Sequence, residues 1–141
     1  METSAASPAR VDWKTLFATA LAGGALAAVL NLLLYFVARA AGVPFEGRFG
    51  GPEAPIGHLV VPMVAVASLL PAPLAAAIYG LLVRSTRRPR VIFLALTVLF
   101  CLLSCGGPMN IGDATPATKL VLALMHFVAA ASISGALVRR R

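Results

Sequence analysis

The chain has 141 residues, of which 60% are hydrophobic and only 12% are charged, and its formal net charge is +7. Soluble domains usually have about a quarter of their residues charged, so this composition excludes an ordinary soluble domain. The basic residues cluster at the ends of apolar runs and not across a polar surface, which argues against nucleic-acid binding. Composition therefore predicts an integral membrane protein, for which we expect no nucleic-acid partner.

Four uncharged apolar runs divide the chain, each close to or above the ~20 residues that a helix needs to cross the hydrocarbon core. We expect an all-α fold, a single four-helix transmembrane bundle over residues 15–138, made of two hairpins. The expected helices cover about 15–41, 58–84, 90–107 and 115–138. Residues 1–14 are expected to form a disordered tail and residues 139–141 a basic one. The first run is too long for the core of a cleaved signal peptide, so we expect it to be a span.

Lys and Arg are unevenly distributed among the segments that join the runs. Nine of the twelve precede the first run, lie in the second gap or follow the last run, whereas the other two gaps hold three. The positive-inside rule therefore predicts a multi-pass protein of the cell membrane with both termini cytoplasmic. Trp13 fits an interfacial anchor on that side. Seven of the arginines are expected to contact anionic lipids there, namely Arg84, Arg87, Arg88, Arg90, Arg139, Arg140 and Arg141.

Small residues recur every four positions along three of the expected helices, so they share one face of each helix. Small side chains let helix backbones approach closely in membranes, which predicts a tightly packed bundle with its polar groups turned inward. The three stripes are Ala20, Gly24, Ala28, Asn31 and Tyr35; Ser68, Ala72, Ala76 and Gly80; and His126, Ala130 and Ser134.

One polar residue of each helix lies about ten residues from its expected outer end, near the middle of the membrane: Asn31, Ser68, Thr97 and His126. An ionisable residue at such depth is a site hypothesis, here for a ligand or a proton centred on His126. The alternative is structural: a neutral imidazole hydrogen-bonded to Asn31 or Ser68 that holds helices together. The absence of an acidic or Lys residue from this level favours the structural alternative.

Two further patterns in the apolar runs each have a functional and a structural interpretation. Pro71 and Pro73 are expected to break or kink the second helix near the same level, as in some transporter sites and in many purely structural helices. Cys101, Cys105 and Met109 share one helical edge, and their soft sulfur atoms suit monovalent copper, but they serve equally as apolar packing residues. We expect no disulfide, no resident metal and no cofactor.

The two outer loops are rich in Gly and Pro and are expected to be irregular. Phe45 and Phe49 in the first loop are expected at the interface or over the bundle mouth, and Thr115 with Pro116 predicts the start of the fourth helix. A weak internal similarity between Gly50-Gly51-Pro52 and Gly106-Gly107-Pro108 is compatible with an internal duplication of the hairpins. The chain holds no pattern of paired carboxylates, Ser with His and an acid, or phosphate loop, so we expect no enzyme.

The stretches from Pro71 to Arg84 and from Leu122 to Ala131, with the Met125-His126 pair as the best marker, resemble a family of small four-helix bacterial membrane proteins grouped as a domain of unknown function. The resemblance implies the four-span fold and a bacterial inner membrane, but no activity, cofactor or site. We expect a non-enzymatic accessory or structural membrane subunit, as a homo-oligomer or with a membrane protein partner. The alternative is a small carrier, or a ligand- or proton-binding protein centred on His126.

Overall fold

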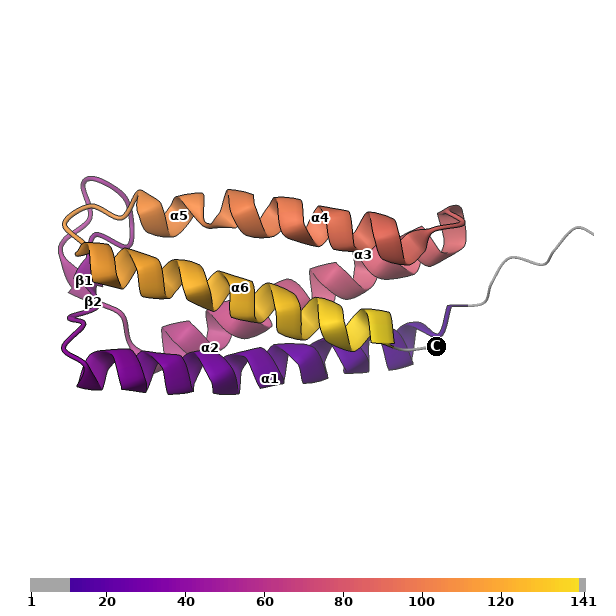
Figure 1. Ribbon diagram of the computed structural model, residues 1–141, viewed down its shortest axis with the longest axis horizontal. Coiled ribbons are helices and arrows are strands. Elements are labelled where there is room, and N and C mark those ends of the chain that lie inside the picture. Colours follow the sequence, from indigo (N-terminus) through magenta and orange to yellow (C-terminus); the bar gives the residue numbers. More distant parts are fainter. Residues whose placement is uncertain (1–10, 140–141) are drawn as a thin grey trace, which may run out of the picture.

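The computed structural model describes residues 11–139 and shows a bundle of long helices (Figure 1). Four helical stretches in this part of the chain are long and apolar enough to cross a membrane, which confirms the prediction of four apolar helices of membrane length. The second and third stretches are each divided in two. A two-residue antiparallel strand pair, β1 (Glu46–Gly47) with β2 (Gly57–His58), was not predicted. The helices are α1 Trp13–Ala40, α2 Val61–Leu69, α3 Pro71–Ser85, α4 Pro89–Ser104, α5 Gly106–Met109 and α6 Pro116–Arg139.

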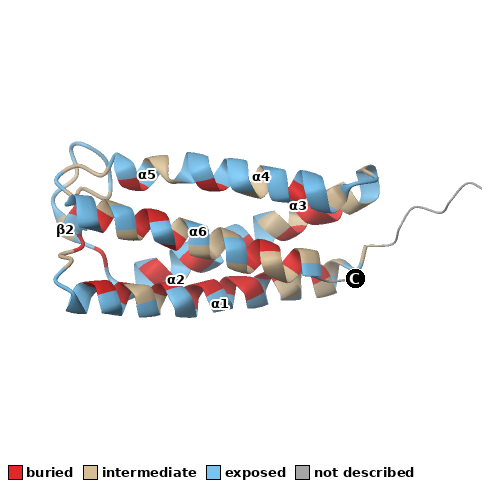
Figure 2. Cartoon of the chain, in the orientation of Figure 1, coloured by how far each residue is buried: buried red, intermediate tan, exposed pale blue. Residues whose placement is uncertain are grey.

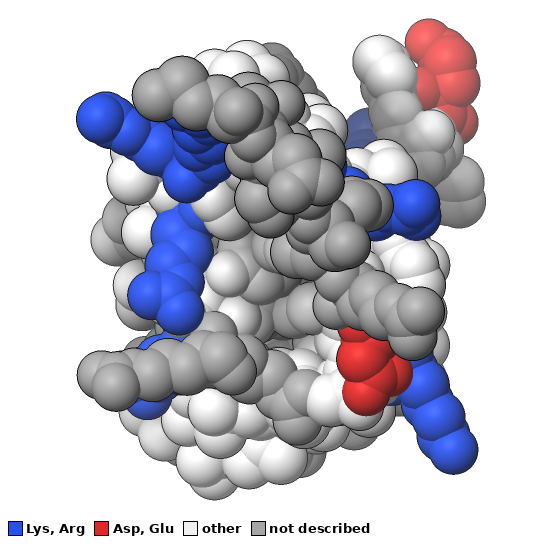
Figure 3. Space-filling model, turned by 90° about the vertical axis from the view of Figure 1, so that its right-hand side faces the viewer, with Lys and Arg blue, Asp and Glu red and all other residues white. Residues whose placement is uncertain are grey.

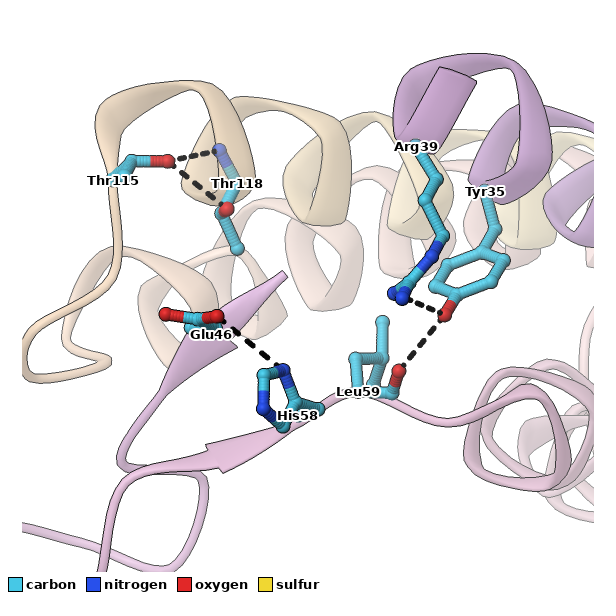
Figure 4. Close-up of polar contacts among 7 residues, drawn as sticks. All are labelled: Tyr35, Arg39, Glu46, His58, Leu59, Thr115 and Thr118. Atoms are coloured by element: carbon cyan, nitrogen blue, oxygen red, sulfur yellow. Dashed lines mark hydrogen bonds and ion pairs between the residues drawn. The ribbon is translucent and has the colours of Figure 1, made fainter. Parts of the chain in front are cut away.

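Capping residues set where the first and last helices begin. The Asp12 carboxylate accepts a hydrogen bond from the Thr15 backbone N–H at 3.2 Å, so α1 begins at Trp13 and includes two residues assigned to the tail. Residues 1–10 of that expected tail lie outside the described residues, as do Arg140 and Arg141. The Thr115 hydroxyl accepts from the Thr118 N–H at 3.2 Å, with Pro116 in the first turn of α6, as predicted (Figure 4).

Helix α1 forms the centre of the packing, because it lies along α6 and also packs against α2 and α3. Helix α4 lies on the far side of the bundle from α1 and packs against α3 and α6 (Figure 1). The start of α1, the turn between α3 and α4 and the end of α6 lie at one end, which we call the basic end. The strand pair and the two long loops lie at the other end, the loop end.

The small-residue stripes of α1 and of α2 with α3 are buried, which confirms the close packing predicted for them. A Cβ added at Gly23 would lie 2.9 Å from the Ile133 Cα of α6, and one at Gly24 would lie 3.2 Å from the Ala72 Cβ of α3. Two successive glycines therefore bring α1 into close contact with two different neighbours.

The buried apolar residues form two clusters, one toward each end of the bundle, and Asn31 and Ser68 fall between them along α1 and along α2 and α3. The cluster toward the basic end contains Leu16, Ala20, Ala72, Ala76, Tyr79, Phe93, Ile133 and Leu137. The cluster toward the loop end contains Tyr35, Ala38, Phe45, Leu59, Val64, Leu122 and Met125.

The two long loops are joined at the loop end by Arg48. Its backbone N–H donates to Gly112 O at 2.9 Å, and its guanidinium pairs with Asp113 at 2.5 Å and donates to Ala54 O at 2.7 Å. Beneath them Phe45 is fully buried against Tyr35, with ring centroids 4.8 Å apart, so it closes the bundle mouth. We call this arrangement the loop cap.

Tyr35 ties the loop cap to α1 and to the strand pair. Its hydroxyl donates to Leu59 O at 3.0 Å and accepts from the Arg39 guanidinium, while Glu46 and His58 face each other across β1 and β2 at 3.6 Å (Figure 4). The two similar Gly-Gly-Pro segments differ in backbone conformation. Gly106 and Gly107 are helical, whereas Gly51 adopts a φ of +109° outside any helix.

Charge separates the two ends of the described chain. The basic end carries six exposed basic residues with one acidic residue, Asp12, and its surface is rich in Lys and Arg (Figure 3). The loop end carries three basic and three acidic residues, and no described residue between the ends is charged. The basic residues of the basic end are Lys14, Arg84, Arg87, Arg88, Arg90 and Arg139.

Candidate functional site

The four residues of the predicted polar level line one cavity of about 530 Å³. The cavity lies among α2, α3, α4 and α6, and Asn31 of α1 reaches its wall. Apolar side chains make up most of the remaining lining, and none of the lining residues is charged. Its size and composition are those of pockets that hold one small molecule, which are typically about 300–1,000 Å³ and mostly apolar with a few polar groups.

The mouth of the cavity is apolar and opens sideways. Leu70 and Leu74 on one rim are 74% and 63% exposed, and Phe100 on the α4 rim is 56% exposed. Helix α2 packs mainly against α1, and most residues of α4 are exposed (Figure 2). All three rim residues belong to membrane-length helices, so in a bilayer the mouth would face acyl chains.

Asn31 forms the polar centre of the cavity wall. Its side-chain nitrogen donates to the Ser68 hydroxyl at 2.9 Å and to the Met125 backbone oxygen at 3.1 Å, so it joins α1 to α2 and α6. The residue is 3% exposed, yet its side-chain oxygen has no hydrogen-bond partner within the protein. A buried acceptor left without a donor costs about 1–3 kcal/mol, so this oxygen needs an explanation.

His126 and Thr97 line the same cavity without bonding to Asn31 or Ser68. The His126 Nδ1 atom lies 2.7 Å from Leu122 O of its own helix, and the Thr97 hydroxyl donates to Phe93 O at 2.9 Å. The expected structural bond from the imidazole to Asn31 or Ser68 is therefore replaced by a bond within α6. His126 does not join helices through a side-chain hydrogen bond, which leaves its ring, half-buried, at the cavity surface.

The second span is divided beside the cavity, at the position of the two prolines. Helix α2 ends at Leu69 and α3 begins at Pro71, while Leu70 between them keeps helical angles (φ −54°, ψ −40°). Proline has no N–H, so Pro71 removes the usual donor to Ala67 O and Pro73 removes the donor to Leu69 O. Ala67 and Pro71 both line the cavity, so the break lies in its wall.

Two of the three sulfur residues lie together: the side chains of Cys101 and Cys105 are hydrogen-bonded to each other. Cys101 is buried and lines the cavity, the Cys105 sulfur lies 3.9 Å from Ala123 O, and Met109 is 47% exposed. Among residues 11–139 no group of three or more His, Cys, Asp or Glu side chains is placed to hold a metal ion. His58 pairs with Glu46 at the loop end.

Sequence reasoning missed most of the α4 wall. Phe93, Phe100, Cys101 and Ser104 line the cavity together with Thr97. Their spacing of three or four residues places them on the Thr97 face of the helix, so extending the face from Thr97 would have found them. A second cavity of about 190 Å³ lies between α4 and α6 and shares Thr97, Cys101, Ala130 and Ser134 with the first.

A family model matches residues 11–141, nearly the whole chain, and its description is a family of unknown function, DUF6069. The chain belongs to this family. The membership agrees with the resemblance to a small uncharacterised membrane family, and the four apolar helices fit it. No curated protein and no solved structure matches the chain. The assignment of roles to DUF6069 residues therefore rests on the geometry of the cavity.

Proposed function

We propose that this DUF6069 protein is a non-enzymatic, multi-pass protein of the bacterial inner membrane that binds an uncharged apolar molecule taken sideways from the bilayer. The observation that supports the proposal is the lateral cavity, with its apolar mouth and its polar wall at Asn31, Ser68, Thr97 and His126. An empty apolar cavity loses dispersion contacts on every wall, so an apolar occupant stabilises it. The absence of charge from the lining favours an uncharged occupant over an ion.

The same proposal places the basic end in the cytoplasm. Six exposed basic residues at this end against a balanced loop end are the asymmetry that the positive-inside rule associates with the cytoplasmic side. Anionic lipid headgroups of that leaflet would contact Arg84, Arg87, Arg88, Arg90 and Arg139, each gaining about 1 kcal/mol near the surface. Arg140 and Arg141 extend the same basic sequence.

A role as a structural or accessory subunit stays a prediction. The exposed apolar residues of α4, such as Val98 and Leu99, fit lipid tails as well as a partner helix or a second copy of the chain. The cavity distinguishes the two roles, because a purely structural subunit has no need for a lateral opening lined by polar groups. We therefore place ligand binding first.

Photo-crosslinking tests the proposal on the full-length protein in lipid nanodiscs. The probe is a long alkyl chain that carries a diazirine near its end, and peptide mass spectrometry locates the labelled residues. We expect label on Phe93 and Met125, which line the cavity and are 3% and 6% exposed. Ala129→Phe, which fills the cavity from α6, should abolish that label.

The matched control is Ala95→Phe, because Ala95 is exposed on α4 outside both cavities. The control variant should keep the label on Phe93 and Met125. Label confined to outward-facing residues such as Leu99, and unchanged by Ala129→Phe, would show that apolar molecules do not enter and would refute the proposal.

A further inference from the structure

Three hydroxyl groups around the cavity have already used their donor hydrogens. The Ser68 hydroxyl donates to Val64 O at 2.8 Å, the Thr97 hydroxyl to Phe93 O at 2.9 Å and the Ser104 hydroxyl to Cys101 O at 2.8 Å. Each hydroxyl has one hydrogen and two lone pairs, so after these bonds only acceptor capacity is left. The three hydroxyls therefore offer acceptors to anything in the cavity.

The orientation of the Asn31 amide follows from its two bonds. The Ser68 hydroxyl donates its hydrogen to Val64 O, and Met125 contributes a backbone carbonyl oxygen. Both groups that face Asn31 therefore act as hydrogen-bond acceptors. Only the amide nitrogen can satisfy two acceptors, and turning the amide around would place oxygen against a carbonyl oxygen. Both N–H groups of Asn31 are thus used, and the side-chain oxygen is the buried acceptor without a donor.

The tautomer of His126 follows in the same way. A backbone carbonyl can only accept, so the nitrogen that lies 2.7 Å from Leu122 O is the one that carries hydrogen. In a neutral ring this leaves Nε2 as an acceptor. No carboxylate lines the cavity to balance a charged imidazole.

Two lining groups keep a hydrogen. Ser134 lies two turns beyond His126 toward the basic end, and Cys101 has a thiol, which is only a weak donor. At the level of His126, by contrast, the Ser68 and Thr97 hydroxyls and the imidazole keep acceptor capacity, and the unpartnered Asn31 oxygen is a further acceptor buried in the wall. The proline break adds a further acceptor to the cavity wall, because Pro71 leaves Ala67 O without its usual donor.

We infer that the cavity selects a lipophilic molecule whose polar end is a hydrogen-bond donor, namely an uncharged alcohol or phenol. This inference rests on the proposed function and specifies its ligand class. A hydroxyl placed among acceptors supplies the hydrogens that the wall lacks, and an ether or ketone of the same shape brings a further acceptor and leaves the wall unsatisfied. A site with unpaired acceptors rejects a ligand without a donor, as sites built around one hydroxyl do.

The test compares 1-dodecanol with dodecyl methyl ether as competitors of the diazirine probe in the same nanodiscs. We expect the alcohol to halve the label on Phe93 and Met125 at a bilayer mole fraction about 2- to 12-fold lower than the ether, the range for one ordinary hydrogen bond. Thr97→Val should reduce this difference, because it removes a lining acceptor. The hydroxyl of Thr97 bonds within its own helix, so the variant leaves interhelical contacts in place.

Thr19→Val is the matched control. The Thr19 hydroxyl also donates to the carbonyl four residues before it, at 2.8 Å, but Thr19 lies outside the cavity. The control should keep the full preference for the alcohol. Equal competition by alcohol and ether, or a preference for the ether, would overturn the inference while leaving the lateral site intact. Failure of the probe itself to label the cavity would instead refute the proposed function.

Discussion

Replacing Gly23 by Ala tests the close packing of α1 on α6. The added Cβ would meet Ile133 Cα at 2.9 Å and Ser132 O at 3.0 Å, and both are backbone atoms that cannot turn aside. Such overpacking typically costs about 1–3 kcal/mol. Alanine also favours the helix over glycine by about 0.5–1 kcal/mol, so we expect a net loss of about 0–2.5 kcal/mol in the free energy of unfolding.

Gly135→Ala in α6 is the matched control, because a Cβ there has no neighbour within 4 Å. The helix-propensity gain is common to both variants, so the difference between them isolates overpacking, about 1–3 kcal/mol. Gly24→Ala should fall between the two, since it meets the Ala72 methyl group at 3.2 Å. Far-UV circular dichroism during titration with a denaturing detergent measures all three. If Gly23→Ala unfolds no earlier than Gly135→Ala, the close approach of α1 and α6 is wrong.

Three further predictions concern the polar centre, the loop cap and the orientation. Ser68→Ala removes an acceptor of Asn31 and should lower the free energy of unfolding by about 0.6 kcal/mol. The control Ser85→Ala, at the exposed end of α3, should leave the free energy of unfolding unchanged. Equal free energies of unfolding for the two variants would contradict a stabilising role of the bond between Asn31 and Ser68. Arg48→Met should speed protease cleavage between Gly50 and Ile56, because the ion pair with Asp113 and the hydrogen bond to Ala54 O are lost. The control Lys119→Met should leave the cleavage rate unchanged. An unchanged cleavage rate for Arg48→Met would show that the loop cap does not depend on these two interactions. Alkaline phosphatase should be active when fused after Gly51 and inactive when fused after Arg141, and the reverse pattern would invert the orientation.

The four apolar helices could be predicted from the sequence because hydropathy and helix capping depend on residues close together in the chain. The pair Thr115 and Pro116 marks the start of α6 whatever the rest of the chain does, and Asp12 could have marked α1 in the same way. The inward face of α1 was also accessible, since Gly24 and Asn31 share one helical face with the alanines around them. Counting about ten residues inward from each expected outer end grouped one polar residue from each helix at one level, and these four residues line one cavity.

The contacts within the site could not be predicted, because they depend on how far neighbouring helices lie apart. The spacing along α6 puts His126 on the inner face, but it does not show that Asn31 bonds to Met125 O and leaves the imidazole to its own helix. The separation of α4 from α2, which creates the cavity, has no local signal either. Arg48 and Asp113 are 65 residues apart, so the loop cap likewise depends on the finished fold.

The proposed ligand site lies between two packed ends of the molecule. Toward the loop end Phe45 is buried beneath the loops that Arg48 joins, and toward the basic end the rings of Tyr79 and Phe93 pack 4.9 Å apart. Alternating access requires a site that opens in turn to the two aqueous sides of the membrane. Under the proposed function, a site that opens along the plane of the membrane would exchange molecules with the lipid, which suits retention or presentation within the bilayer better than movement across it.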